Sequence, residues 1–179
     1  MTTTSNDALK GIRVVEFAVF AAGPLVGKHL GEHGAEVIRI ESQTSPDGFR
    51  VHYPPFKDDR PGLERGGSYA LFNDQVLGVT LNLKHPRAVA LAKELVSKAD
   101  IIIENFAQGV MDRLGLGYCA LSEMKPDLIM LSSCNQGQTG RRAKHHWIIA
   151  GTRVRDSASI FRSMSPVSSS LYRSCLTHK

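Results

Sequence analysis

DIIIENFAQGVMDRLGLGYCALSEMKPDLIMLSSCNQGQTG, residues 100–140, contains two short apolar runs that each lead into a polar loop. Ile101–Ile103 is followed by Glu104-Asn105-Phe106, and Leu128–Leu131 opens into a loop of Ser, Asn, Gln and Gly that ends at Gly140. Buried parallel strands that end in this way form the ligand crevice of open α/β sheets. We therefore expect the functional site at the carboxyl ends of these two strands.

The chain upstream continues the alternation of apolar strands and helical patterns. Residues 9–20 and 35–41 read as strands with a helix, 25–33, between them, and Gly34 fits the end of that helix. Residues 76–83 alternate like a half-buried strand, and 87–99 have apolar residues at helical spacing. This order predicts an α/β fold of Rossmann-like type, an open and mostly parallel sheet with flanking helices.

Two connections in this region invite a functional interpretation. The Gly23-Pro24 turn is either ordinary scaffold or a place where backbone amides approach an anion near a helix start. No GxGxxG motif accompanies it, so a dinucleotide fingerprint is not supported. Residues 42–68 are rich in Pro, Gly and charge, which is typical of a functional or a mobile loop.

Composition narrows the class of protein. With 179 residues, the chain is one domain or part of a larger one. No apolar run approaches the roughly 20 residues of a membrane helix, and the first seven residues lack a signal-peptide core. Three cysteines without CxxC spacing predict reduced thiols and no metal site. We expect a cytoplasmic chain that binds no membrane.

The net charge of +5 belongs to one end of the chain. Residues 1–140 carry 14 Lys and Arg against 16 Asp and Glu, whereas 141–179 carry eight against Asp156 alone. The basic end lacks an aromatic stripe or an RNA-binding signature, so no nucleic-acid partner is expected.

The opening stretch also resembles a known family. Glu104-Asn105-Phe106, Arg113–Leu116 and Gly137–Gly140, with Gly109, Tyr118 and Pro126, are similar to the signature of the type III CoA-transferases. These CaiB/BaiF-like proteins include formyl-CoA and carnitine CoA-transferases. Residues 131–140 and 53–57 are most similar to the benzylsuccinate CoA-transferase branch. The resemblance covers roughly residues 9–140.

The resemblance implies an activity and a cofactor. Family members move coenzyme A from an acyl-CoA donor to a carboxylic acid acceptor through an aspartyl-CoA intermediate. Their nucleophile lies about thirty residues beyond the Gly-Gln-Thr-Gly loop. Residues 168–171 contain no acid here, and Asp156 matches nothing in the motif. We therefore assign no catalytic residue and leave open whether this chain is an enzyme.

Six positions match residues that contact coenzyme A in the formyl-CoA relative. Lys84 and Arg113 would pair with phosphates, Phe106 would cover the adenine or pantetheine, and Asn105 would form hydrogen bonds. Core packing explains Leu81 and Phe20 equally well. The predicted cofactor-binding residues are Phe20, Leu81, Lys84, Asn105, Phe106 and Arg113.

Two departures from the family pattern lie beside these positions. Residues 75–78 lack the cations that relatives carry before this strand, and Ala21 replaces a polar residue that could donate to the thioester oxygen. The lost phosphate contacts predict weaker coenzyme A binding, because each lost charge-assisted hydrogen bond costs roughly 1.5 to 3 kcal/mol.

The end of the chain departs from the family altogether. Family members are about twice as long, so residues 1–140 are interpreted as the amino-terminal part of the large domain. Residues 141–179 are interpreted as an aberrant, Ser-rich, disordered tail, with a reading-frame shift or misplaced boundary as the hypothesis for 146–179. Full-length relatives are homodimers, and this fragment is expected to be inactive and to expose a sheet edge or apolar patch. An acyl-CoA racemase or a non-catalytic, weak coenzyme A binder remain alternatives.

Two further patterns have a more ordinary explanation. His29-Leu30-Gly31-Glu32-His33 matches the HxxEH zinc pattern, but Gly31 weakens the helix and no third ligand stands out, so two solvent-exposed histidines are expected. Cys134 has no His near it in sequence, and a packed or loop thiol is expected rather than a nucleophile.

Overall fold

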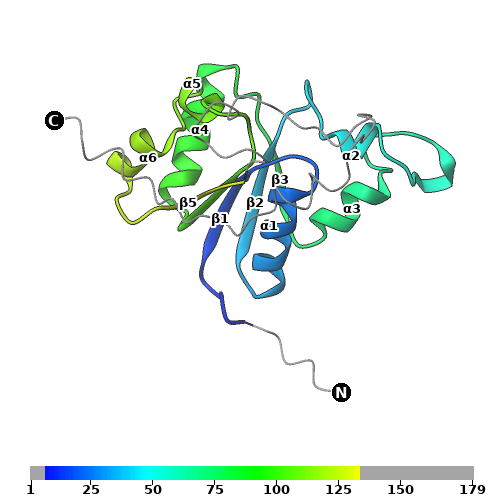
Figure 1. Cartoon of the computed structure of the whole chain (residues 1–179), viewed down its shortest axis with the longest axis horizontal. Coiled ribbons are helices and arrows are strands. Elements are labelled where there is room, and N and C mark those ends of the chain that lie inside the picture. The colour runs from blue at the N-terminus through cyan, green and yellow to red at the C-terminus, as the bar shows by residue number, and fades with distance from the viewer. Residues whose placement is uncertain (1–6, 134–179) are drawn as a thin grey trace, which may run out of the picture.

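The computed structural model describes residues 7–133, which form a five-stranded sheet between two layers of helices (Figure 1). The strand order is β3-β2-β1-β4-β5, and every neighbouring pair is parallel. The strands are β1 (Arg13–Phe17), β2 (Glu36–Glu41), β3 (Leu77–Thr80), β4 (Ile101–Glu104) and β5 (Ile129–Ser132). The order reverses between β1 and β4, as in doubly wound folds. The Rossmann-like prediction is confirmed.

Helices cover both faces of the sheet. Figure 1 shows α1 (Ala22–Glu32) and α3 (Gly67–Asn73) on one side, with α4 (Pro86–Ser97), α5 (Val110–Arg113) and α6 (Tyr118–Met124) on the other. The helix α2 (Gly48–Val51) and a 3-10 turn (Lys57–Asp59) lie within the β2–α3 connection.

The inner strands form the core because their side chains are buried on both faces. Val14 of β1 and Ile103 of β4 pack in the cluster that Leu30 of α1 joins. Val15, the next residue of β1, and Ile102, the preceding residue of β4, pack in the larger cluster beneath α4, α5 and α6. The alternation that a strand imposes therefore places neighbouring residues in different cores.

Three boundaries differ from the sequence-based expectation. Helix α1 begins at Ala22 rather than residue 25, because Pro24 fits the first turn of a helix, where its missing N–H is not needed. The strand expected over residues 76–83 is only the four-residue edge strand β3, three residues of which are exposed. The 42–68 connection contains two short helical elements and is held by polar contacts.

The other edge strand leaves apolar side chains uncovered. Ile129 and Leu131 of β5 are 61% and 37% exposed, while Met130 between them packs against the core beneath α4. Leu71 and Leu77 are exposed to a similar degree, 62% and 60%, so the expected apolar patch stays a prediction. The predicted tail, 141–179, lies outside the described residues. No helix within residues 7–133 is long and apolar enough to span a membrane.

Candidate functional site

The six predicted cofactor-binding residues lie in the segments that follow β1, β3 and β4. Because all five strands are parallel, these segments all begin on the side of the sheet where the strands have their carboxyl ends, at the top of the view in Figure 1. They comprise Phe20 after β1, Leu81 and Lys84 after β3, and Asn105, Phe106 and Arg113 after β4. The fold thus gathers residues that are up to 93 positions apart in sequence (20 to 113) at one edge.

These residues differ in how much of their side chain is available. Leu81 and Phe106 are partly buried and pack against the same apolar cluster beneath α4. Lys84, before α4, and Arg113, at the end of α5, are exposed. Neither cationic group forms an ion pair within residues 7–133. Lys84 and Arg113 are therefore the members of the set best placed to meet an anion.

Asn105 has protein partners for its side chain. Its Oδ1 accepts a hydrogen bond from the Val19 N–H at 2.9 Å, and its Nδ2 donates to the Val19 carbonyl at 2.7 Å. The site prediction for Asn105 stays a prediction, but the structure assigns its amide a role in joining β4 to the turn after β1.

Phe20 follows Val19 in that turn and adopts an unusual backbone conformation. Its φ is +60°, a region that residues with a side chain rarely occupy. Its N–H donates to Asp47 Oδ2 at 2.8 Å. Its ring meets those of Phe49 and Tyr53 edge-on, with centroids 5.5 and 6.1 Å away. Both the backbone and the ring of Phe20 are therefore held by the β2–α3 connection.

A buried charge cluster lies behind this turn. Arg39 of β2, Glu16 of β1 and Asp47 are each at most 1% exposed. Arg39 binds Asp47 through Nη2 and Asn73 through Nη1, while its Nε is 3.7 Å from Glu16 Oε1. Asp47 also accepts the Phe49 N–H at 2.7 Å, which caps α2.

Glu16 is the member of this cluster that lacks hydrogen bonds. Neither of its carboxylate oxygens has a hydrogen-bond partner among the described residues, and the same is true of Arg39 Nε. Burial raises the pKa of Glu16 to about 7, although the Arg39 charge opposes this shift and the Asp47 charge adds to it. Two buried acids thus face one guanidinium, and a proton on Glu16 balances the charge near neutral pH.

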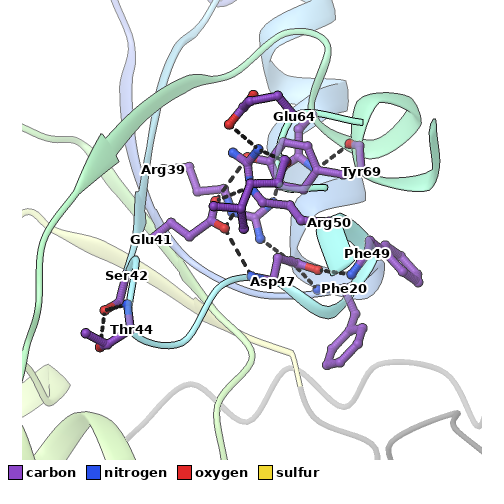
Figure 2. A network of polar contacts seen from close by, with 12 residues as sticks. Phe20, Arg39, Glu41, Ser42, Thr44, Asp47, Phe49, Arg50, Glu64 and Tyr69 are labelled. Carbon is purple, nitrogen blue, oxygen red and sulfur yellow. Dashed lines mark hydrogen bonds and ion pairs between the residues drawn. The ribbon is translucent and has the colours of Figure 1, made fainter. Parts of the chain in front are cut away.

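A second cluster extends the first toward solvent (Figure 2). Arg50 Nε donates to both oxygens of Glu41, at 2.8 and 3.1 Å, and its guanidinium lies 3.6 Å from the centre of the Tyr69 ring. Burial alone would raise the pKa of Glu41, but the Asp47 N–H and Arg50 outweigh it and lower that pKa. Arg50 also reaches Glu64 at 3.2 Å. These contacts fix residues 42–68 to the end of β2.

The end of β4 carries one more buried acid. Glu104 is 2% exposed, and its Oε2 accepts the Phe106 N–H at 2.8 Å. Burial raises the pKa of Glu104 against the lowering effect of hydrogen bonds from Ser132 and Phe106. A small hollow beside it is lined by Asp112, Tyr118 and Ser132. The hollow connects the end of β4 with α5 and α6.

The histidines and cysteines have ordinary protein partners. His29 Nδ1 lies 2.9 Å from Glu32, and His33 Nδ1 donates to the His29 carbonyl at 2.7 Å. Residues 7–133 contain no group of three potential metal ligands. Cys119 is in a disulfide bond, so the prediction that all three thiols are reduced is wrong for this residue. Cys134 lies outside the described residues.

Sequence reasoning missed the Glu16, Arg39 and Asp47 cluster. The signal was present, because Glu16 and Arg39 each interrupt an apolar strand, RVVEF and EVIRIE. A charge within a strand that is covered on both faces must be paired or protonated. Asp47 gives no comparable signal, since it lies in a polar connection.

Comparison with known proteins gives concordant results. The sequence model of CoA-transferase family III matches residues 9–150. The beta subunit of succinyl-CoA--L-malate CoA-transferase from Chloroflexus aurantiacus is 36% identical over 140 residues, which are 77% of this chain and 33% of that protein. Succinate--glutarate CoA-transferase from Agrobacterium fabrum is 38% identical over 133 residues, 74% of this chain and 33% of that protein. The chain spans about a third of the length of these relatives.

Solved structures agree with the sequence relatives. A CaiB/BaiF family protein from Brucella suis superposes with a TM-score of 0.69 at 37% identity, covering 76% of this chain and 35% of the other. A protein from Mycobacterium tuberculosis gives a TM-score of 0.68 at 30% identity, covering 78% and 37%.

Proposed function

The chain belongs to CoA-transferase family III, and we propose that residues 7–133 form part of a coenzyme A site at the carboxyl edge of the sheet. One observation carries this proposal. The six positions matched to coenzyme A in the family all lie in segments that follow β1, β3 and β4, on either side of the point where the strand order reverses. Ligands of open α/β sheets bind at such points.

The exposed cations give the site its chemistry. Coenzyme A carries phosphates at one end, and Lys84 and Arg113 offer charged donors without an ion-pair partner in the described part of the chain. Phe106 and Leu81, which are partly buried against one apolar cluster, would contribute apolar surface to the site. Residues 75–78 add no cation, and Ala21 has no donor side chain, so the proposed binding is weak.

The reaction we propose for the whole protein is the family's transfer of coenzyme A between an acyl-CoA donor and a carboxylic acid. An aspartate would attack the thioester carbonyl of the donor, which forms an anhydride and releases the coenzyme A thiolate. The thiolate would then attack the aspartyl carbonyl, which forms the aspartyl thioester and releases the donor carboxylate. The acceptor carboxylate would attack that thioester in the same way, and the returning thiolate would form the new acyl-CoA and free the aspartate. Asp156 is the only acidic residue after Gly140 in this sequence, and it does not match the family motif. We infer that the 179-residue chain does not catalyse transfer by itself.

Two observations bear on which acid accepts coenzyme A: the names of the relatives and the similarity to one branch of the family. The names of the relatives from Chloroflexus and Agrobacterium refer to dicarboxylic acids: malate, succinate and glutarate. The finer proposal, an aromatic succinate, follows from the similarity to the benzylsuccinate branch. The edge-to-face rings of Phe20, Phe49 and Tyr53 are the described feature that supports it. A homodimer in the cytoplasm remains part of the same proposal.

A racemase of the same family is the second candidate, and a non-catalytic coenzyme A binder the third. Isothermal titration of the full chain with coenzyme A, beside an assay with succinyl-CoA and benzylsuccinate, separates these outcomes. Binding heat without turnover is the expected result. Turnover by this chain alone would contradict the inference that it lacks its nucleophile, and an absence of binding would contradict the proposed site.

A further inference from the structure

The turn that links β1 to α1 is held from the β4 side by one asparagine. Both backbone groups of Val19 bond to Asn105, its N–H at 2.9 Å and its carbonyl at 2.7 Å. A side-chain amide that bonds both groups of one residue imitates a neighbouring strand. It therefore extends the pairing of β1 with β4 beyond Phe17 and Glu104, where the sheet ladder ends.

The same turn is held from the β2 side by an aspartate. Asp47 accepts the Phe20 N–H at 2.8 Å, and Phe20 has a φ of +60°. This conformation costs roughly 1 to 2 kcal/mol for a residue with a side chain, so contacts must hold it. The ring of Phe20 lies so close to Gly48 that a methyl group there would overlap it. The backbone of Phe20 is therefore held by Asp47, and its ring packs closely against Gly48.

Each of the two clamping residues is fixed by its surroundings. Asp47 is 1% exposed and bonds Arg39 and the Phe49 N–H in addition to Phe20. Asn105 lies against Gly23 of α1, where an added methyl would be 3.4 Å from its Cγ and would overlap Ala18. The turn is therefore placed between two supports that cannot easily move.

We propose that Asn105 and Asp47 are positioning residues that clamp residues 18–21 from opposite sides, and that Asn105 keeps both bonds to Val19 when coenzyme A binds. The second part rests on the proposed function, while the first stands on the hydrogen bonds alone. The consequence concerns the cofactor. Asn105 would shape the wall of the coenzyme A site through the turn, and any contact it makes with the cofactor would use the acceptor site and the donor that the Val19 bonds leave over.

Amide hydrogen exchange of the full chain, followed by NMR, tests the clamp directly. The Val19 and Phe20 amides should exchange at least about tenfold more slowly than amides of exposed loops. Asn105→Ala should remove the protection of Val19 after correction for the global stability of each variant. Asp100→Ala is the matched control, since Asp100 accepts the Arg13 N–H at 2.9 Å at the other edge of the sheet. Free exchange of Val19 and Phe20 in the unmodified chain overturns the clamp, even if Asn105→Ala does not fold.

Exchange in the presence of coenzyme A tests the second part. The positioning role predicts that saturating coenzyme A leaves Val19 protection unchanged or raises it. A ligand contact that replaces the bonds to Val19 requires Asn105 to turn away, so faster exchange of Val19 on binding would overturn the proposal. Chemical-shift changes elsewhere report whether coenzyme A binds at all. If none occur, the proposed function fails, while the clamp is still decided by exchange in the free chain.

Discussion

Replacing Glu16 by Gln should remove a pH dependence from the stability of this protein. Glu16 is completely buried, and neither carboxylate oxygen has a hydrogen-bond partner among the described residues. Its pKa is about 7 in the folded chain against an ordinary 4.5. The folded state therefore keeps a proton between these two pH values that the unfolded state has lost. The contribution of Glu16 to the free energy of unfolding is therefore fully present below about pH 4.5 and is lost as the pH rises through about 7.

The size of the effect follows from the shift. One pKa unit corresponds to 1.36 kcal/mol, so the shift amounts to about 3 kcal/mol between the acid and neutral limits. Gln resembles the protonated acid in shape and carries no charge at any pH. We expect Glu16→Gln to be more stable than the parent near pH 8, where the parent must bury a carboxylate that Arg39, 3.7 Å away, only partly balances.

Urea unfolding followed by circular dichroism at several values from about pH 5 to pH 8 measures the effect. The matched control is Glu36→Gln, since Glu36 is half exposed and pairs with Arg13 at the start of β2. Every titratable group other than the substituted one is present in parent, variant and control alike. The difference between the two variants therefore isolates Glu16. A stability profile for Glu16→Gln that parallels the parent's would refute the reasoning.

Further substitutions test the same neighbourhood and the cofactor site. Gly27→Ala should cost about 1 to 3 kcal/mol of unfolding free energy, because the new methyl overlaps the Glu16 carboxylate, whereas Gly78→Ala meets no atom and should be nearly neutral in urea titrations. Arg113→Ala should weaken coenzyme A binding by about tenfold or more in calorimetry and reduce its salt dependence, as expected for a lost phosphate contact. Lys98→Ala, which removes a solvent-exposed partner of Glu94, is the control and should leave binding unchanged.

The fold was largely predictable because its inner strands carry a strong local signal. Residues 13–17 and 101–104 are apolar runs buried on both faces, and the helix at 86–97 shows clear helical spacing. The edge strand β3 was overestimated. Strand β3 pairs with β2 alone, and the pairing needs only four residues. The rest of the alternating stretch, residues 81–83, lies in the connection that leads to α4.

The sequence predicted which strand ends carry the candidate residues but not the contacts that these residues make. Sequence placed Asn105 at the end of a strand, where the structure finds it, yet only the fold reveals Val19 as its partner across 86 residues. The order within residues 42–68 escaped sequence reasoning for the same reason. Arg50 lies in this connection, whereas its partners Glu41 and Tyr69 belong to β2 and α3, so the contacts form only once these two elements are in place.

The position of the Glu16 and Arg39 pair suggests why a sheet would tolerate it. Glu16 and Arg39 lie opposite each other in the parallel register of β1 and β2, one position after the pair of Val15 and Ile38. A slip by one residue would turn Arg39 toward the other face and leave its guanidinium among apolar side chains without Asp47. That misregistered sheet carries an unpaired buried cation, which costs several kcal/mol, whereas the native register leaves without hydrogen bonds only the protonated Glu16 and the Nε of Arg39 among the groups of this pair. The pair therefore contributes little net stability but strongly disfavours the alternative pairing. The same register places Asp47 where it can hold Phe20, which links the pairing of β1 with β2 to the shape of the coenzyme A site we propose.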